Sequence, residues 1–164
     1  MSDTRTLKNK RIKDVWYLDD YWAGKIIESL EPYHVTEEEI IEVGRRWDPR
    51  PYHIDREAAA KSLFGSLVAC SAHLFCIVSW LAHNVEDDVA AVSGLGWNNI
   101  KMHAPVRPND EISLKAHCLE SRPSKTRPDC GVVTCRNSLF NQRGELVFSA
   151  EVSLLVMCRP KQEI

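Results

Sequence analysis

The sequence predicts an α+β fold in which one long central helix is wrapped by an antiparallel sheet. The first observation is a stripe of apolar residues at 3.6-residue spacing between Leu67 and Ala82, which is typical of a long and mostly buried helix. The second is a change after residue 88 to four apolar or alternating segments separated by turn residues, a pattern that favours an antiparallel sheet. The 164 residues show no linker, repeat or low-complexity segment, so we expect a single domain over residues 1–164.

The first half of the chain is expected to begin with a polar and mobile arm over residues 1–14. Four aromatic residues between positions 16 and 22 then indicate a segment that packs onto the core or onto a partner subunit. Thr36 can cap a helix that ends at Asp48, because a residue before proline is biased away from the helical conformation. The elements expected here are a strand over 25–30, a helix over 36–48, a short helix over 56–63 and the long helix over 67–84.

The second half of the chain contains the segments that we expect to form the sheet. The segment 111–119 alternates polar and apolar residues, as a half-buried strand does. The segment 141–144 ends in glycine and predicts a hairpin turn. The strands expected here cover 89–102, 111–119, 131–140 and 145–157, and the other turns cover 104–110 and 122–129.

Charge and composition exclude several classes of function. The net charge is −2 and both signs are interspersed, so nothing favours binding to nucleic acid or to an anionic membrane. The longest apolar stretch is interrupted by Ser71, His73 and Ser79, and it is too short and too polar to span a bilayer. The basic residues between positions 8 and 13 are not followed by the apolar segment of a secretory signal. We therefore expect a cytoplasmic protein.

The six cysteines are expected to be reduced and buried thiols. None of them forms a CxxC pair and no histidine stands at the spacing of a zinc finger, so we expect no metal site. Cys70 stands near the start of the long helix, where the helix dipole can acidify a thiol. A small apolar side chain in the core is the alternative and more common role for Cys70.

The stretch Trp47-Asp48-Pro49-Arg50-Pro51-Tyr52-His53-Ile54-Asp55 is dense in reactive groups. We expect Asp48 and His53 to form an acid/base pair, because an imidazole transfers protons near neutral pH and a carboxylate can orient the same water. Pro51 and the proline two residues before it stiffen the segment. Asp55 is interpreted as the cap of the next helix rather than as a third catalytic acid. Taken alone, an aspartate before a proline and a single loop histidine are more often structural than catalytic.

These motifs resemble those of the MaoC-like acyl dehydratases, a branch of the hot-dog fold related to R-specific enoyl-CoA hydratases. The family is marked by an aspartate, a Pro-x-His-x-Asp motif, an alanine-containing helix, a Phe-Gly turn and an Ile/Val-Ala run at the start of the central helix. In this chain they are Asp48, Pro51-Tyr52-His53-Ile54-Asp55, Ala58-Ala59, Phe64-Gly65 and Val68-Ala69. Trp97 and the connections at 105–110 and 141–145 are also similar, so the resemblance covers about residues 22–157.

The resemblance implies a hot-dog fold and the reversible hydration or dehydration of an enoyl or 3-hydroxyacyl thioester, with Asp48 and His53 activating water. It implies that Ser71, where the family usually has glycine, supplies a backbone N–H to the oxyanion, with Cys70 and Pro51 beside the substrate. No metal or other cofactor is implied, since coenzyme A or a carrier protein arrives as part of the substrate. A homodimer or a higher homo-oligomer is implied, because the sheets of this family pair edge to edge.

Two further sets of residues bear on the choice of substrate. Arg50 stands where many of the hydratases have asparagine, which affects the expected substrate range more than the expected reaction. Arg122, Lys125 and Arg127 form a basic cluster that can contact phosphates of coenzyme A or of a carrier-protein arm. A solvated loop is the more common role for such a cluster.

Two other functions on the same fold remain open from the sequence. A non-catalytic subunit could bind acyl thioesters or complete the site of another subunit, and the serine at position 71 leaves room for this role. A thioesterase is the weaker alternative, because it is expected to carry a carboxylate on the central helix, and residues 66–84 contain neither Asp nor Glu.

Overall fold

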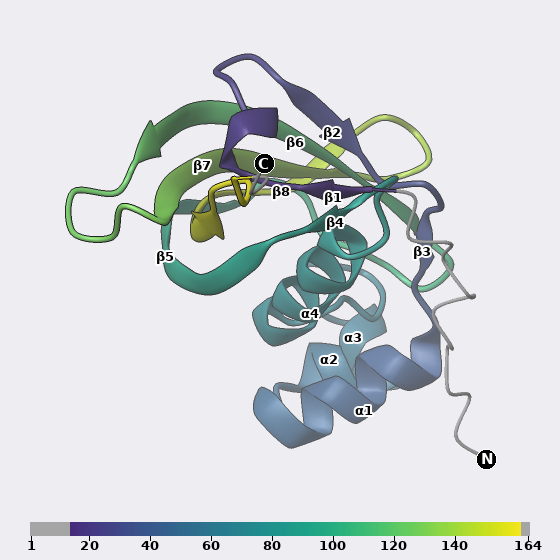
Figure 1. Cartoon of the computed structure of the whole chain (residues 1–164). Helices are drawn as coiled ribbons and strands as arrows, with labels where there is room; N and C mark the ends of the chain where they lie inside the picture. The colour runs from purple at the N-terminus through teal and green to yellow at the C-terminus, as the bar shows by residue number, and fades with distance from the viewer. Residues whose placement is uncertain (1–13, 162–164) are drawn as a thin grey trace.

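The computed structural model describes residues 14–161 and contains one large antiparallel sheet (Figure 1). Its strands are β2 (Ile26–Glu28), β5 (Ala91–Met102), β6 (Glu111–Pro123), β7 (Cys130–Phe140) and β8 (Leu146–Met157). They are hydrogen-bonded in the order β2-β6-β7-β8-β5, and the two-residue strand β3 (Tyr33–His34) pairs with β6. The four long strands are those expected from the second half of the sequence, except that β6 continues past its predicted end at 119 into the start of the turn predicted over 122–129. The strand expected over 25–30 is also present, but it is shorter.

The helices form a second layer on one side of the sheet (Figure 1). The longest of them, α4 (Ser71–Ala82), packs directly against the sheet. Three helices cover the side of α4 that faces away from the sheet: α1 (Glu37–Trp47), α2 (Pro51–Ile54) and α3 (Arg56–Ala60). This arrangement confirms the predicted α+β fold with one long helix wrapped by an antiparallel sheet.

The N-terminal aromatic segment packs onto the core of its own chain. Strand β1 (Val15–Trp16) pairs in parallel with β4 (Asp88–Val89), and the 3₁₀ turn η1 (Leu18–Asp20) follows β1. Tyr21 is buried in a small cluster with Cys118, Val133 and Val156 on the sheet. Of the arm expected over residues 1–14, residues 1–13 lie outside the described part of the chain.

The main core lies between α4 and the sheet. Ile77 and Leu81 of α4 are fully buried there, together with Ile112 of β6 and Phe148 of β8. Each buried side chain of this size contributes about 1.5–3 kcal/mol relative to exposure. This burial, rather than a cap, anchors α4, since Cys70 at its N-cap makes no side-chain capping bond. No helix within residues 14–161 has the length and apolar character needed to cross a bilayer.

The predicted start of the long helix is wrong by four residues, because residues 67–70 are not helical. Their backbone is paired with other segments: the N–H of Val68 donates to Tyr52 O (3.2 Å) and the N–H of Ala69 donates to Val106 O (2.9 Å). Bonds to residues distant in sequence therefore outweigh the helical pattern of this apolar run. The consequence is that α4 begins at Ser71, an exposed residue that is the first of the helix.

Candidate functional site

Asp48 and His53 lie close together at the junction of α1 and α2. Asp48 ends α1, and its N–H donates to Gly44 O at 2.9 Å. His53 lies on α2, a single helical turn that begins at Pro51, where a proline is well tolerated. Asp48 Oδ2 is 3.6 Å from His53 Nε2. This separation is too long for a direct hydrogen bond, but it allows both groups to contact one water molecule.

The imidazole of His53 is held in a defined orientation. Its Nδ1 lies 2.6 Å from the carbonyl oxygen of Val68, and the residue as a whole is 6% exposed. Because a carbonyl oxygen only accepts hydrogen bonds, we assign the proton to Nδ1, so that neutral His53 presents the lone pair of Nε2 toward Asp48. The ring of Tyr52 packs against the imidazole at 4.5 Å and against Phe64 at 5.1 Å. A buried base thus faces a carboxylate that solvent can reach.

Arg50 orients the other side of the Asp48 carboxylate. Its Nε lies 3.3 Å from Asp48 Oδ1, and both side chains are partly exposed. An exposed pair of this kind contributes at most about 1 kcal/mol. Its effect is therefore geometric, since it engages Oδ1 while Oδ2 points to His53. The asparagine that many of the hydratases carry at this position would make no ion pair with Asp48.

A glycine in the middle of α1 allows α2 to approach, and no sequence motif pointed to its role. A Cβ atom at Gly44 would lie 3.0 Å from both Cβ and the carbonyl oxygen of His53, and 3.1 Å from Ile54 Cγ2. Contacts this short would force the two helices apart. A glycine inside a helix is less stable than an alanine. Its presence within the predicted helix was therefore the feature of the sequence that could have indicated this close approach.

The first turn of α4 follows directly on the segment whose backbone holds the imidazole of His53. Val68, whose carbonyl oxygen contacts Nδ1 of His53, stands three residues before Ser71. The intrahelical bonds begin with the N–H groups of His73 and Leu74, which donate to Cys70 O at 3.0 and 3.3 Å. The N–H groups of Ser71 and Ala72 precede these bonds and are the orphan donors of a helix N-terminus. They can stabilise a negative charge there.

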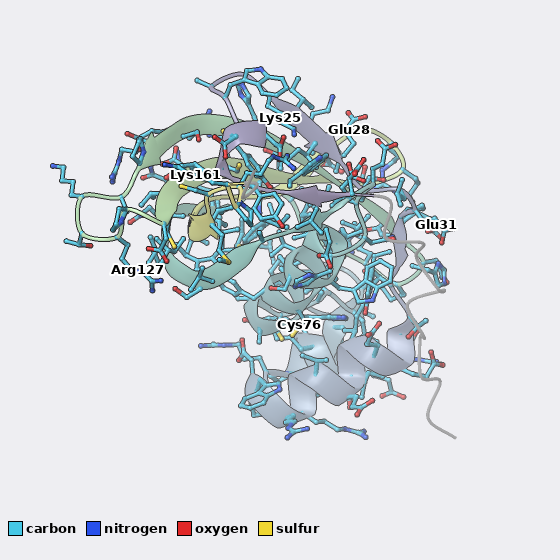
Figure 2. The ribbon with its side chains drawn as sticks, in the orientation of Figure 1. Lys25, Glu28, Glu31, Cys76, Arg127 and Lys161 are labelled. Carbon is cyan, nitrogen blue, oxygen red and sulfur yellow. The ribbon has the colours of Figure 1, made fainter. Side chains whose placement is uncertain are left out.

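The remaining predicted residues take different positions. Cys70 is buried at the N-cap of α4, Pro51 is exposed at the start of α2, and Asp55 caps α3 by accepting from Ala58 N–H at 2.8 Å. Arg122 lies near the end of β6, where it pairs with Glu120 at 3.2 Å, and Arg127 lies in the β6–β7 connection, where it pairs with Asp129 at 2.7 Å. In Figure 2, Arg127 lies at one end of the sheet, away from α1, which ends at Asp48, and from α2, which carries His53.

An apolar cavity of about 380 Å³ lies along the second half of α4. Its walls come from α4, from the inner face of the sheet and from the N-terminal segment, and they include Val78, Ala82, Trp97, Leu114 and Trp16. Between this cavity and the first turn of α4, the ring of Phe75 contacts the rings of Trp97 at 5.3 Å and Phe148 at 5.8 Å. Among the described residues, no group of three or more His, Cys, Asp and Glu side chains is arranged to hold a metal ion.

Comparison with known proteins identifies the family. Residues 23–138 match the family model of the MaoC-like domain, which is more than half of the chain. The chain belongs to the MaoC-like dehydratase family. One curated relative is the uncharacterised protein YdeM of Bacillus subtilis, which is 27% identical over 85% of this chain and 97% of its own length.

Solved structures agree with the membership in the MaoC-like family. A MaoC-like dehydratase from Rhodospirillum rubrum is 33% identical, with a TM-score of 0.80 over 89% of this chain and 99% of that one. An R-hydratase from Pseudomonas aeruginosa shares the fold at 19% identity, with a TM-score of 0.71 over 90% of this chain and 92% of that one. The hot-dog fold expected for a MaoC-like protein is therefore confirmed.

Proposed function

We propose that this protein is a hydro-lyase that reversibly adds water to an enoyl thioester and removes it from a 3-hydroxyacyl thioester. The observation that carries the proposal is the pair formed by Asp48 and the buried, oriented imidazole of His53, whose facing atoms are 3.6 Å apart. Membership in the MaoC-like family supports a reaction of the hydratase or dehydratase type. An acid/base pair of this kind contributes about 10²–10⁴ in rate.

In the hydration direction, one water would bridge Asp48 Oδ2 and His53 Nε2. Nε2 accepts a proton from this water as the water oxygen forms a bond to the β-carbon of the enoyl group. The carboxylate of Asp48 holds the water and stabilises the imidazolium that forms. A proton then passes from His53 to the α-carbon, which restores both side chains. Because addition and proton return use one face of the double bond, the proposal predicts syn addition.

The negative charge on the thioester oxygen would be met by the first turn of α4. The N–H groups of Ser71 and Ala72 are the donors available for this task, and Cys70 and Pro51 would lie beside the substrate. Removing one such donor from an enzyme typically lowers kcat about 10²–10³-fold. A serine at position 71 keeps the backbone N–H that the family's glycine provides and adds one exposed hydroxyl.

The acyl chain would enter the apolar cavity beside the second half of α4. The cavity volume of about 380 Å³ suits a short or medium acyl chain, and its lining of Val78, Ala82, Leu114 and Trp97 suits a hydrocarbon. Coenzyme A or a carrier protein would remain outside, and no further cofactor is needed because the proton transfers balance. Contacts of Arg122, Lys125 and Arg127 with phosphates stay a prediction.

We also propose that the protein acts as a homodimer that forms through β5. This strand is the edge of the sheet beyond β8, and its side chains Val92, Leu95, Trp97, Ile100 and Met102 are exposed apolar groups. A long apolar edge strand is a template for pairing with another chain. Pairing two copies through β5 would join the two sheets and cover these residues.

The proposal is tested by incubating the protein with crotonyl-CoA and with longer trans-2-enoyl-CoA esters, and following the loss of enoyl absorbance. The wild-type protein should turn over at least one of them, and Asp48→Asn and His53→Ala should each lower kcat by about 10²–10⁴. Asp55→Asn is the matched control, since asparagine also caps a helix, and it should remain active. Tight binding of these thioesters without turnover would instead identify a non-catalytic acyl-binding subunit.

A further inference from the structure

A second polar cluster lies in the core, away from Asp48 and His53. It consists of Tyr33 on β3, Glu39 in the first turn of α1 and His73 in the first turn of α4, and we call it the Tyr33–Glu39–His73 cluster. The hydroxyl of Tyr33 donates to Glu39 Oε1, and Glu39 Oε2 lies 3.6 Å from His73 Nε2. The rings of Tyr33 and His73 meet edge to face at 6.5 Å. Three elements of the fold are thus joined at one point.

Burial of the His73 side chain at this position is unfavourable for the stability of the fold. Its side chain is 1% exposed, and within residues 14–161 neither ring nitrogen has a hydrogen-bond partner at normal distance. Tyr33, whose ring meets that of His73, belongs to the main hydrophobic core together with Ile40, Leu74 and Ile77. Apolar side chains of similar volume at both position 73 and position 39 would remove these buried polar atoms, and replacing a whole buried polar pair in this way is often neutral or stabilising. Stability alone therefore does not explain a histidine here.

The position of His73 links two parts of the candidate site. It stands two residues after Ser71, and its own N–H donates to Cys70 O at 3.0 Å. Its partner Glu39 belongs to α1, the helix that ends at Asp48. A contact between Glu39 and His73 therefore joins the turn that carries the N–H donors to the helix that carries the acid.

We propose that Glu39 and His73 are positioning residues that hold the first turn of α4 against α1, with Tyr33 fixing the carboxylate of Glu39. This inference rests on the proposed hydro-lyase function. Neither side chain touches the reacting atoms; they act through the N–H groups of Ser71 and Ala72. Because such donors act on charge that develops in the transition state, loosening them lowers kcat and leaves KM nearly unchanged.

The first test compares three variants of the first turn of α4 by steady-state kinetics with the best enoyl-CoA substrate. His73→Leu preserves volume and removes the contact with Glu39, and it should lower kcat about 10–100-fold with KM within about twofold. His73→Gln keeps a donor that reaches Glu39 and should recover most of this loss. Leu74→Met changes the neighbouring core residue conservatively and should keep wild-type kcat. A His73→Leu protein with wild-type kcat would overturn the proposal.

A second kinetic test starts from the other partner. Glu39→Gln should lower kcat in the same direction as His73→Leu, because the amide replaces the charge that faces the imidazole. In the double variant the two losses should not multiply, since each change already breaks the same contact. Full multiplication of the two losses would show that the residues act independently, and it would overturn the pairing.

A structural measurement separates this inference from the proposed function. Hydrogen–deuterium exchange of the peptide that covers the start of α4 should be faster in His73→Leu and in Glu39→Gln than in the wild type and in Leu74→Met. This readout needs no activity. If the wild type hydrates no enoyl thioester but exchange rises as expected, the proposed function fails while the positioning link stands. If exchange is unchanged in both variants, the link fails.

Discussion

The N–H of Ser71 can be removed without removing the helical turn that carries it. Ser71 is the first residue of α4, where proline is tolerated because its missing N–H has no intrahelical partner. Cys70 before it is extended, with φ −78° and ψ 166°, as a residue before proline must be. We expect Ser71→Pro to lower kcat about 10²–10³-fold with little change in the midpoint of thermal unfolding. Ser71→Ala keeps the N–H and should stay active; equal activity of both variants would exclude this N–H as the oxyanion donor.

The thiols should differ in reactivity according to burial. Burial raises the pKa of the Cys135 thiol to about 12 and also raises the pKa of Cys118, whereas Cys76 is exposed on α4 (Figure 2). Since the thiolate is the reactive form, a thiol reagent at pH 8 should label Cys76 in the native protein. Cys118 and Cys135 should react only after denaturation. Mass spectrometry of the labelled peptides identifies which thiols have reacted, with Cys76→Ser as the control. Rapid labelling of Cys135 in the native protein would contradict the prediction.

Among the elements, the contact of α1 with α2 depends on Gly44. Alanine is favoured over glycine in a helix by up to about 1 kcal/mol, but a Cβ at this position would lie 3.0 Å from the backbone oxygen of His53. We expect Gly44→Ala to destabilise the protein by about 1–3 kcal/mol and to lower kcat at least tenfold by displacing His53. Urea unfolding and enoyl-CoA kinetics measure the two effects. Glu42→Ala, an exposed change on the same helix, should alter neither; a stable and fully active Gly44→Ala protein would show that α2 has room to move.

The sequence predicted those features of the helices that depend on residues close together in the chain. The proline after Asp48 ends α1, and the spacing of Asp48 and His53 brings them together across one turn. It did not predict that residues 67–70 lie outside the helix, because bonds from Val68 and Ala69 reach Tyr52 and Val106. The close approach at Gly44 and the contact between Glu39 and His73, 34 positions apart, likewise depend on how the helices pack. No local pattern encodes such contacts.

For the whole molecule, the sheet order determines which surface is left for a second copy. The sequence predicted the strands, but only their order shows that β5 and β2 lie at opposite ends of the main sheet. Each end carries an exposed leucine: Leu95 on β5 is 52% exposed, and Leu30 just after β2 is 57% exposed. This symmetry provides a matched pair of substitutions for the proposed dimer.

A lysine at Leu95 should prevent pairing through β5, because its charge would be placed against the edge of the second sheet. We expect light scattering after size-exclusion chromatography to give a dimer for the wild type and for Leu30→Lys, and a monomer for Leu95→Lys. Circular dichroism should show that all three proteins keep the same fold, since both leucines are exposed in the single chain. A dimer that survives Leu95→Lys but is lost in Leu30→Lys would move the interface to the β2 end of the sheet. In that case the apolar side chains of β5 would need another partner.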